Sequence, residues 1–212
     1  MSNIADIRKD YRLRSFSERD AAATPFEQFK QWWEEALASN IDEPNAMTLA
    51  TADATGSPSA RIVLLKGVTE EGFEFFTNYE SHKAKDVVQN VRVSLVFFWK
   101  ELERQIRING NAVKTTEAVS DEYFKSRPFE SRIGAWASPQ SEEIESRDGL
   151  EQRVDELREQ YRDREVPRPP FWGGYLVKPV MMEFWQGRPN RLHDRIEYKL
   201  TKGSWKKRRL AP

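Results

Sequence analysis

Five short runs rich in Val, Ile, Phe and Thr lie between residues 46 and 114, and this series constrains the fold more than any other feature of the 212-residue chain. The runs span residues 46–53, 60–68, 73–78, 91–99 and 105–114. Such composition is typical of strands, and turn-forming residues such as those at 55–58 and 70–72 separate the runs. Short connections allow antiparallel pairing, whereas parallel strands need long crossovers. We therefore expect an antiparallel sheet that closes on itself.

Helices and further strands complete the expected fold. Thr24, Pro25 and Glu27 form a capping-box pattern, which predicts an amphipathic helix that ends near Asn40. Further helices are expected at 81–90, capped by Ser81, and at 120–127, 131–137 and 144–164, and closing strands at 174–185, 191–200 and 204–210. The class is mainly β with α (α+β), with peripheral helices. Residues 21–212 are expected to form a single domain, and residues 1–20 a flexible arm or a lid over a site.

Composition excludes several kinds of function. Lys plus Arg (34) equals Asp plus Glu (34), so no overall field favours nucleic acid, and there is no cysteine for thiolate chemistry. Two histidines are too few for a multi-histidine metal site. The charged N-terminus and the lack of a long apolar run argue against a membrane protein, so we expect a cytoplasmic protein. From the histidine and cysteine counts we expect that it binds no metal.

Arg191, His193 and Arg195 recur at a spacing of two. In a strand their side chains would leave one face, about 6.5 to 7 Å apart between neighbours. Burying two guanidiniums and a histidine together without partners would cost several kcal/mol. This spacing therefore predicts a ligand that is an anion or a polar ring.

Two further groups of residues suit a phosphate. Thr77 ends a strand just before the helix opened by Ser81, and Lys83 lies in the first turn of that helix. Tyr123, Arg127 and Ser131 recur at a spacing of four, which places them on one helical face if the helix continues through Pro128. A capped helix after a strand and a solvated helix face are the simpler alternatives.

Other polar positions carry less information by themselves. Arg61 and Lys66 flank an apolar run and could serve only as edge charges. Gln105 could be an ordinary outward-facing strand residue. The chain lacks the glycine-rich motifs of dinucleotide and P-loop sites, so phosphate would have to be bound by side chains.

Several motifs together resemble the pyridoxamine (pyridoxine) 5′-phosphate oxidase family. The most specific is Glu183-Phe184-Trp185-Gln186 followed, after four residues, by Arg191-Leu192-His193-Asp194-Arg195. The resemblance extends from Arg8 to Pro212 and includes, in order, the segments at 61–66, 102–105, 126–128, 133–136, 140–141 and 171–174.

This resemblance implies an antiparallel split β-barrel homodimer with flavin mononucleotide (FMN) at the subunit interface. It implies that FMN contacts Arg61, Ile62, Val63, Leu64, Leu65, Lys66, Phe76, Thr77, Lys83, Gln105, Gln140, Ser141, Trp185 and Arg195. The substrate phosphate would meet Lys66, Tyr123, Arg127 and Ser131. Arg191 and His193 would be the catalytic pair that holds the pyridine ring, and Arg8 and Tyr11 would close over it.

One position departs from the family pattern, because His82 stands beside Lys83 where members often carry arginine. An imidazole there could make FMN affinity sensitive to pH, with a charge-assisted bond of about 1.5 to 3 kcal/mol at stake.

The activity that the resemblance implies is oxidation of pyridoxamine or pyridoxine 5′-phosphate to pyridoxal 5′-phosphate, with dioxygen reduced to hydrogen peroxide. The alternatives are a non-catalytic protein that binds FMN or pyridoxal phosphate, and an FMN oxidase that acts on another ring.

Overall fold

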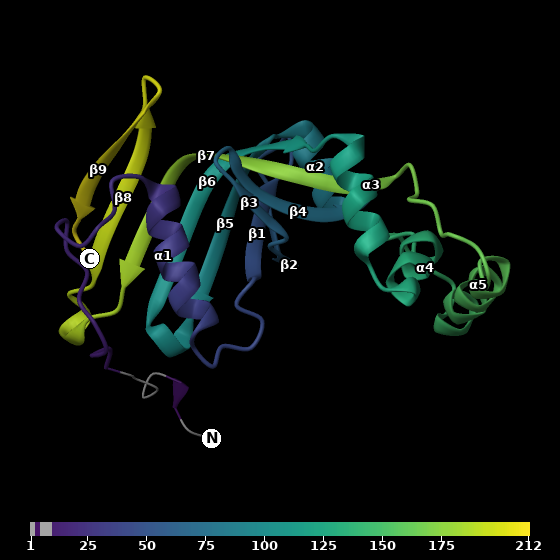
Figure 1. Cartoon of the computed structure of the whole chain (residues 1–212), viewed down its shortest axis with the longest axis horizontal. Helices are drawn as coiled ribbons and strands as arrows, with labels where there is room; N and C mark the ends of the chain where they lie inside the picture. Colours follow the sequence, from purple (N-terminus) through teal and green to yellow (C-terminus); the bar gives the residue numbers. More distant parts are fainter. Residues whose placement is uncertain (1–2, 5–9) are drawn as a thin grey trace.

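The structure, a computed structural model, describes residues 3–4 and 10–212 of the chain. Nine strands of the described part form one sheet; of the five α-helices in that part, one lies on one face of the sheet and three extend from one end (Figure 1). The strands are β1 (Ala46–Ala52), β2 (Pro58–Leu64), β3 (Gly67–Thr69), β4 (Gly72–Asn78), β5 (Arg92–Trp99), β6 (Arg104–Lys114), β7 (Trp172–Gln186), β8 (Asp194–Thr201) and β9 (Ser204–Leu210). No helix in the described part of the chain is long and apolar enough to span a membrane.

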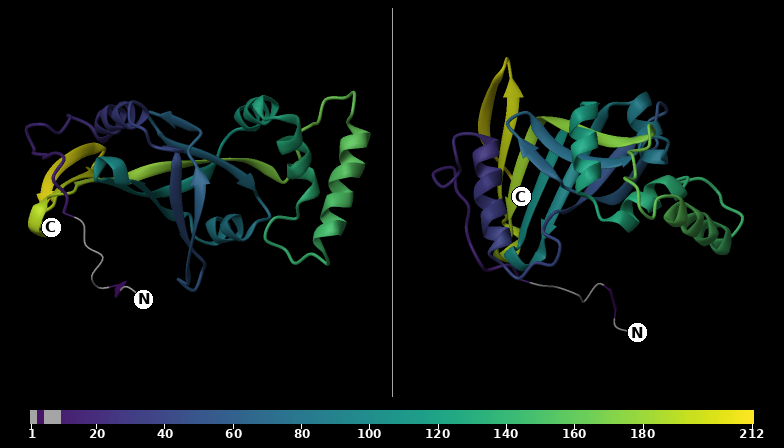
Figure 2. Two further views of the ribbon diagram at one scale, coloured as in Figure 1. Left: turned by 90° about the horizontal axis from the view of Figure 1, so that it is seen from below. Right: turned by 45° about the vertical axis from the view of Figure 1, so that its right-hand side comes forward.

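All strand pairings in the sheet are antiparallel. The strand order is β2-β1-β5-β6-β7-β4-β3, and β8 pairs with both β7 and β9. The long strand β7 links two parts of the sheet, because its first residues pair with β4 and its last residues pair with β8. The sheet curls into a half-barrel of the split-barrel type (Figure 2). It stays open, because β2 and β3, the two ends of the strand order, do not pair in the described part of the chain. The expected antiparallel α+β fold is therefore confirmed, with a curl that stops short of closure.

Helix α1 (Pro25–Leu37) covers one face of the sheet (Figures 1 and 2). Its start is fixed as predicted, since Thr24 accepts from the Glu27 backbone and Glu27 accepts from the Thr24 backbone. The ring of Phe29 lies 4.8 Å from that of Phe73 and 5.6 Å from that of Phe97. These aromatic contacts hold α1 on the alternate, inward-facing residues of the sheet.

A second, smaller apolar cluster lies at the far end of the molecule. Helices α3 (Glu117–Ser126), α4 (Phe129–Ala137) and α5 (Arg147–Gln160) extend from the sheet, as Figure 1 shows. Phe124, Ile133 and Leu157 pack there with Trp172, the first residue of β7. Helix α2 (His82–Gln89) follows β4.

Several predicted elements have different limits. The run 60–68 is interrupted, because β2 ends at Leu64 and β3 begins at Gly67, which leaves Lys66 in the connection. The helix expected at 144–164 spans only Arg147–Gln160, and the one expected from Ser120 begins at Glu117. The helix expected to stop before Pro128 does so, since Arg127 is extended and a new helix begins at Phe129. Tyr123, Arg127 and Ser131 therefore do not share one continuous helical face.

The prediction that Arg191, His193 and Arg195 share one strand is wrong. Residues Pro189–Arg191 form a 3₁₀ turn, and Arg191 has a φ of 62° in the left-handed region. Strand β8 begins only at Asp194. Of the three residues, Arg195 alone lies in a strand, so the other two are placed by the turn.

Candidate functional site

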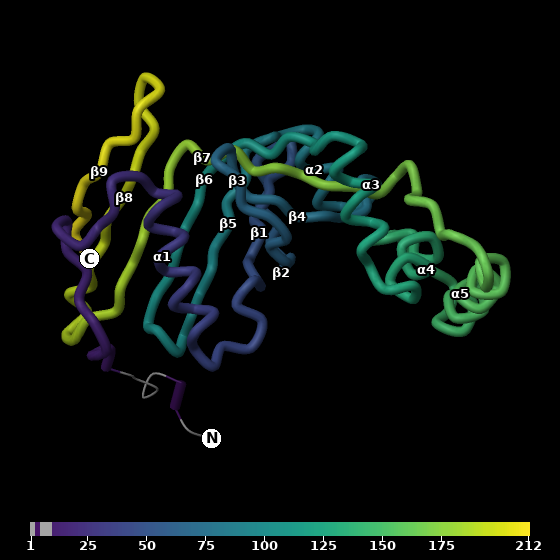
Figure 3. Tube along the Cα trace, viewed as in Figure 1, coloured from purple at the N-terminus to yellow at the C-terminus, as the bar shows by residue number. Residues whose placement is uncertain are grey.

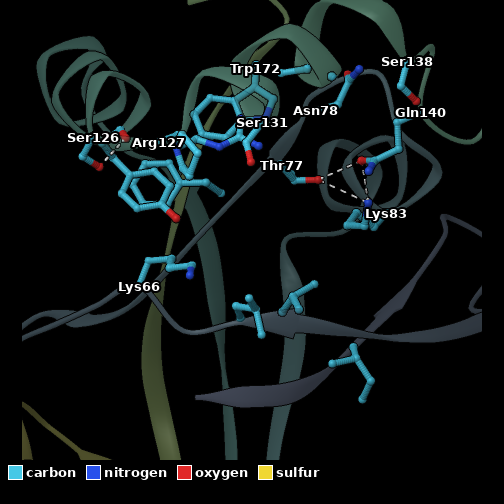
Figure 4. A pocket seen from close by; sticks show the side chains of 18 residues that line it. Lys66, Thr77, Asn78, Lys83, Ser126, Arg127, Ser131, Ser138, Gln140 and Trp172 are labelled. Carbon is cyan, nitrogen blue, oxygen red and sulfur yellow. Dashed lines mark hydrogen bonds between the residues drawn. The ribbon is translucent and has the colours of Figure 1, made fainter. Parts of the chain in front are cut away.

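A cavity of about 720 Å³ lies between the sheet and the α3–α4 helices. Figure 4 shows its polar side chains gathered in two places. The lining residues come from β2, β4, α2, α3, α4, their connections and the start of β7: Ile62, Val63, Leu64, Lys66, Phe76, Thr77, Asn78, Lys83, Tyr123, Ser126, Arg127, Pro128, Ser131, Gly134, Ala135, Ser138, Gln140 and Trp172.

One polar group of the cavity is built around Lys83. Its Nζ donates to Gln140 Oε1 at 3.0 Å and to Thr77 Oγ1 at 3.2 Å, as drawn in Figure 4. Ser81 precedes α2, as predicted, but its hydroxyl donates to the Asn78 carbonyl at 2.7 Å and does not cap the helix. The first backbone N–H groups of α2 therefore keep their capacity to bind an anion. Burial, together with the nearby charge of Arg61, lowers the pKa of Lys83 to about 8.

The second polar group is built around Arg127. Its guanidinium carbon lies 4.6 Å from the centre of the Trp172 ring, and its Nη1 is buried without a hydrogen-bond partner. Such an unpaired donor is costly unless a ligand satisfies it. Helix α3 ends before Pro128 and α4 begins after it, and Ser131 of α4 lines the same cavity. Tyr123 stacks on Phe76 with ring centres 4.0 Å apart.

Arg61 and His82 face a buried carboxylate outside this cavity. Asp86 accepts from the Thr51 hydroxyl at 2.5 Å and lies 3.9 Å from Arg61 and 3.7 Å from His82. The His82 side chain is 65% exposed. Since neither residue lines the cavity, any effect of His82 on a ligand there would be indirect.

A separate group of residues meets where β7 ends. The ring of His193 lies 4.5 Å from that of Trp185, and Tyr11 packs edge-on against both rings. Nδ1 of His193 accepts from the backbone N–H of Arg188 at 3.1 Å. A neutral imidazole with an accepting Nδ1 carries its proton on Nε2. Burial and the charge of Arg191 lower the pKa of His193, against a smaller opposite effect of Asp194, so the neutral form is favoured.

Gln105, Trp185 and Arg195 form a row across three neighbouring strands. Gln105 pairs with Trp185, and Trp185 pairs with Arg195, so all three side chains share one face of the sheet. In the next row on that face, Glu183 accepts from Arg195 and Arg107, both at 2.6 Å. Burial by itself would raise the pKa of Glu183. The hydrogen bonds from Arg195 and Arg107 together have the larger effect, so the pKa lies below its usual value.

The two groups of residues are held at opposite ends of β7. Trp172, in the cavity, and Trp185 are thirteen positions apart in one strand, which corresponds to roughly 40 Å of extended chain. Figure 1 shows this strand running from α3 to the start of β8. One small ligand cannot touch both ends within a single chain.

The predicted site residues are therefore divided between several places. The cavity takes Ile62, Val63, Leu64, Lys66, Phe76, Thr77, Lys83, Tyr123, Arg127, Ser131 and Gln140. The far end of β7 takes Tyr11, Gln105, Trp185, His193 and Arg195, with Arg191 exposed in the adjacent turn. Leu65 is buried in the core, Ser141 is exposed, and Arg8 lies outside the described residues.

Other residues of the site were not predicted. Asn78, Ser126, Ser138 and Trp172 line the cavity, and Glu183 holds Arg195. Glu183 could have been found, because it stands two positions before Trp185 and so shares its face of β7. Among residues 3–4 and 10–212 no group of three or more His, Asp or Glu residues is placed to hold a metal ion.

Comparisons with known proteins identify the family to which the chain belongs. A family model described as "Pyridoxamine 5'-phosphate oxidase" matches residues 33–161, and one described as "Pyridoxine 5'-phosphate oxidase C-terminal dimerisation region" matches residues 172–212, which supports a homodimer. A pyridoxine/pyridoxamine 5′-phosphate oxidase of Paraburkholderia phymatum is 56% identical over 213 residues and 100% of both chains. One of a Cyanothece species is 54% identical over 210 residues and 99% of both chains.

Solved structures give the same result. PhzG from Burkholderia lata, in complex with tetrahydrophenazine-1-carboxylic acid, matches with a TM-score of 0.90 at 30% identity, over 96% of this chain and 100% of its own. An FMN-binding protein of Nostoc punctiforme, described as related to pyridoxamine 5′-phosphate oxidase, shares the fold at 16% identity, with a TM-score of 0.71, over 90% of this chain and 100% of its own. The chain therefore belongs to the pyridoxamine 5′-phosphate oxidase family and is an oxidase of that type.

Proposed function

We propose that this protein is an FMN-dependent oxidase that converts pyridoxamine or pyridoxine 5′-phosphate to pyridoxal 5′-phosphate. The observation that carries the proposal is one cavity with two separate groups of cationic and hydroxyl side chains, around Lys83 and around Arg127. FMN and the substrate each carry one phosphate. A protein that only carried a flavin would have no need of the second group.

The Lys83 group fits the phosphate of FMN. It combines an ammonium, the Thr77 hydroxyl and the uncapped start of α2, and Gln140 holds the first two in place. A phosphate on these donors would receive charge-assisted hydrogen bonds. The apolar side chains of Ile62, Val63 and Leu64, along β2, would lie beside the flavin ring.

The Arg127 group fits the phosphate of the substrate. Its unpaired Nη1 supplies a buried donor, and the hydroxyls of Tyr123 and Ser131 line the same cavity. Lys66 lines the same cavity from the connection between β2 and β3, where its ammonium could reach a bound anion. Arginine and hydroxyl donors together suit the oxygens of a phosphomonoester.

The remaining residues would come from the partner subunit of a homodimer. The row of Gln105, Trp185 and Arg195 crosses the far end of β7, and from there it cannot reach the cavity of its own chain. The same row begins at Phe98, which pairs with Gln105 and is 54% exposed, as expected of a face that a partner covers. Residues from β7 onward match a dimerisation region. FMN would then lie between the cavity of one subunit and this row of the other.

Bound FMN would supply the hydride acceptor for the 4′ carbon of the substrate, and dioxygen would be reduced to hydrogen peroxide. The hydroxyl or amine proton would leave to solvent, and with the amine substrate water would hydrolyse the resulting imine and release ammonia. His193 would be neutral and would donate from Nε2 to the ring or its reacting substituent, since Nδ1 is engaged by the Arg188 backbone. Arg191 has donors only and would stabilise negative charge on the substrate. Both side chains thus orient the substrate and neither is arranged to remove a proton.

A direct experiment tests the proposal. The purified protein should take up one FMN per chain and release hydrogen peroxide when pyridoxine 5′-phosphate is added. The Arg191→Ala variant should keep its FMN and lose most of its turnover per bound flavin. Absence of FMN uptake by the wild-type protein, or unchanged turnover in Arg191→Ala, would contradict the proposal.

The similarity to PhzG favours a second candidate, an oxidase that acts on a phenazine-type ring. The fold match to that protein is close, but the identity of 30% is well below the 54–56% shared with the pyridoxine/pyridoxamine 5′-phosphate oxidases. A tricyclic substrate without phosphate would also leave Arg127 unpaired. Comparison of both substrates on the same preparation decides between them.

A further inference from the structure

A buried carboxylate fixes the N-terminal segment just after Tyr11. Glu103 Oε2 accepts from the backbone N–H of Arg12 at 2.8 Å and of Leu13 at 3.1 Å. The residue is 3% exposed, and it lies ninety positions from these partners in the sequence. Figure 3 shows the purple N-terminal segment passing the ends of β6 to β8 before it reaches α1. A carboxylate that accepts two backbone bonds in a buried place is a strong local anchor.

The same residue also fixes the turn that follows β7. The carbonyl of Glu103 accepts from Gly187 N–H at 2.7 Å and from the Gln186 side chain at 3.2 Å. Glu103 has a φ of 54°, and this left-handed conformation turns its carbonyl and its carboxylate toward two different segments. The N-terminal segment and the start of the turn at 187–193 are therefore attached to one residue.

The Tyr11 ring lies where these two segments meet. A Cβ at Gly187 would come within 2.6 Å of Tyr11 Cγ, so the ring rests directly on the glycine backbone. From there the ring contacts Trp185 and His193 edge-on, with centres 5.7 Å and 6.0 Å away. The position of Tyr11 thus depends on the anchor at Glu103 and on the missing side chain at Gly187.

We propose that Glu103 is a positioning residue, which holds Tyr11 against Trp185 and His193 and so completes the wall of the substrate site. The statement that this wall belongs to a substrate site rests on the proposed function. Glu103 does not line the cavity, and we assign it no contact with cofactor or substrate. Its carboxylate acts through two backbone amides, and its effect on turnover passes through the Tyr11 ring.

The mechanical part of the proposal is tested without turnover. Hydrogen exchange at the amides of Arg12 and Leu13 should be slow in the wild-type protein and at least tenfold faster in Glu103→Ala. Glu103→Gln should keep most of the protection, because its amide oxygen still accepts both bonds. The control is Glu101→Ala, an exposed residue of the same turn, which should leave exchange unchanged. Equal exchange in Glu103→Ala and wild type overturns the proposal whatever the enzyme does.

The functional part is tested by a double-mutant cycle. Glu103→Ala should lower kcat/KM for pyridoxine 5′-phosphate about tenfold, mainly through KM, with FMN content unchanged. In a Tyr11→Ala background the same change should have less than a twofold effect. Gly187→Ala, which displaces the ring and leaves the carboxylate intact, should reproduce the loss. A purely structural role predicts multiplied effects of Glu103→Ala and Tyr11→Ala, and that result would overturn the proposal.

Discussion

The cavity around Lys83 and Arg127 and the row around Trp185 differ in how they are built. The cavity is enclosed by strands and helices of one chain, and its donors already face a common space (Figure 4). The row is a line of side chains on one face of the sheet, ordered by strand register and by the buried Glu183. The first region is an enclosed cavity, and the second is an open face of the sheet.

Under the proposed function, neither region is sufficient alone. The cavity offers two places for anions but has none of the residues of the Glu183–Arg195 motif. The far end of β7, where this row meets His193 and Arg191, offers an indole, an imidazole and guanidiniums but encloses nothing within its own chain. Opposite ends of one rigid strand keep them apart, so an isologous dimer can bring the row of each subunit over the cavity of the other.

The largest effect is expected from loss of the carboxylate that supports the row. Glu183 is 2% exposed and is paired with both Arg107 and Arg195. Glu183→Ala leaves these charges without a partner and should lower the free energy of unfolding by about 3 to 5 kcal/mol. Urea denaturation measures this loss. Glu197→Ala, which frees the more exposed Arg208, serves as the comparison and should cost clearly less; equal losses would show that Glu183 has no special role.

Removal of the second anion-binding group should act on catalysis and spare the flavin. Arg127→Ala should reduce kcat/KM for pyridoxine 5′-phosphate about 100- to 1000-fold, as loss of two charge-assisted bonds implies. FMN content should stay at the wild-type level, since the Lys83 group is intact. Steady-state kinetics and flavin absorbance measure the two quantities, with the exposed Lys125→Ala as control. Parallel loss of FMN would mean that the two groups are one site.

Flavin affinity should depend on pH through Lys83. Its pKa of about 8 in the free protein means that the ammonium loses its proton as the pH rises through that value. A neutral amine attracts a phosphate dianion poorly, so FMN affinity should fall about tenfold between pH 7 and pH 9. Fluorescence titration of the apoprotein measures it. Lys83→Arg, which stays charged, should show a much flatter profile; an equally steep one would assign the pH dependence to another group.

The smallest effect is expected at His82. Its side chain is largely exposed, faces Asp86 and does not line the cavity. With one largely exposed partner such a pair contributes under about 1 kcal/mol, so His82→Ala should change the dissociation constant of FMN by less than about fivefold. The same titration measures it. A loss of 100-fold would show that His82 contacts the phosphate directly.

The sequence predicted the elements better than it predicted how they combine. Runs of strand-forming residues between turn signals were enough to place most of the strands, and the capping box fixed the start of α1. The spacing of Arg191, His193 and Arg195 misled, because a spacing of two has structural meaning only inside a strand and the left-handed Arg191 interrupts it. Tyr123, Arg127 and Ser131 meet at the cavity although their helix breaks at Pro128. The face that Glu183 shares with Trp185 follows from their spacing, but its pairing with Arg107 and Arg195 depends on strand register, which no local pattern encodes.

A subunit-mixing experiment tests most directly whether the site is shared between two chains. Arg127→Ala removes the cavity half and Arg191→Ala removes the surface half, so each homodimer should be nearly inactive. When the two variants are unfolded together and refolded in equal amounts, mixed dimers contain one intact site. Half of the dimers would then have one of two sites working, and activity should recover to about a quarter of the wild-type level. Activity that stays at the sum of the two variants would contradict a site built from the cavity of one subunit and the β7 surface of its partner.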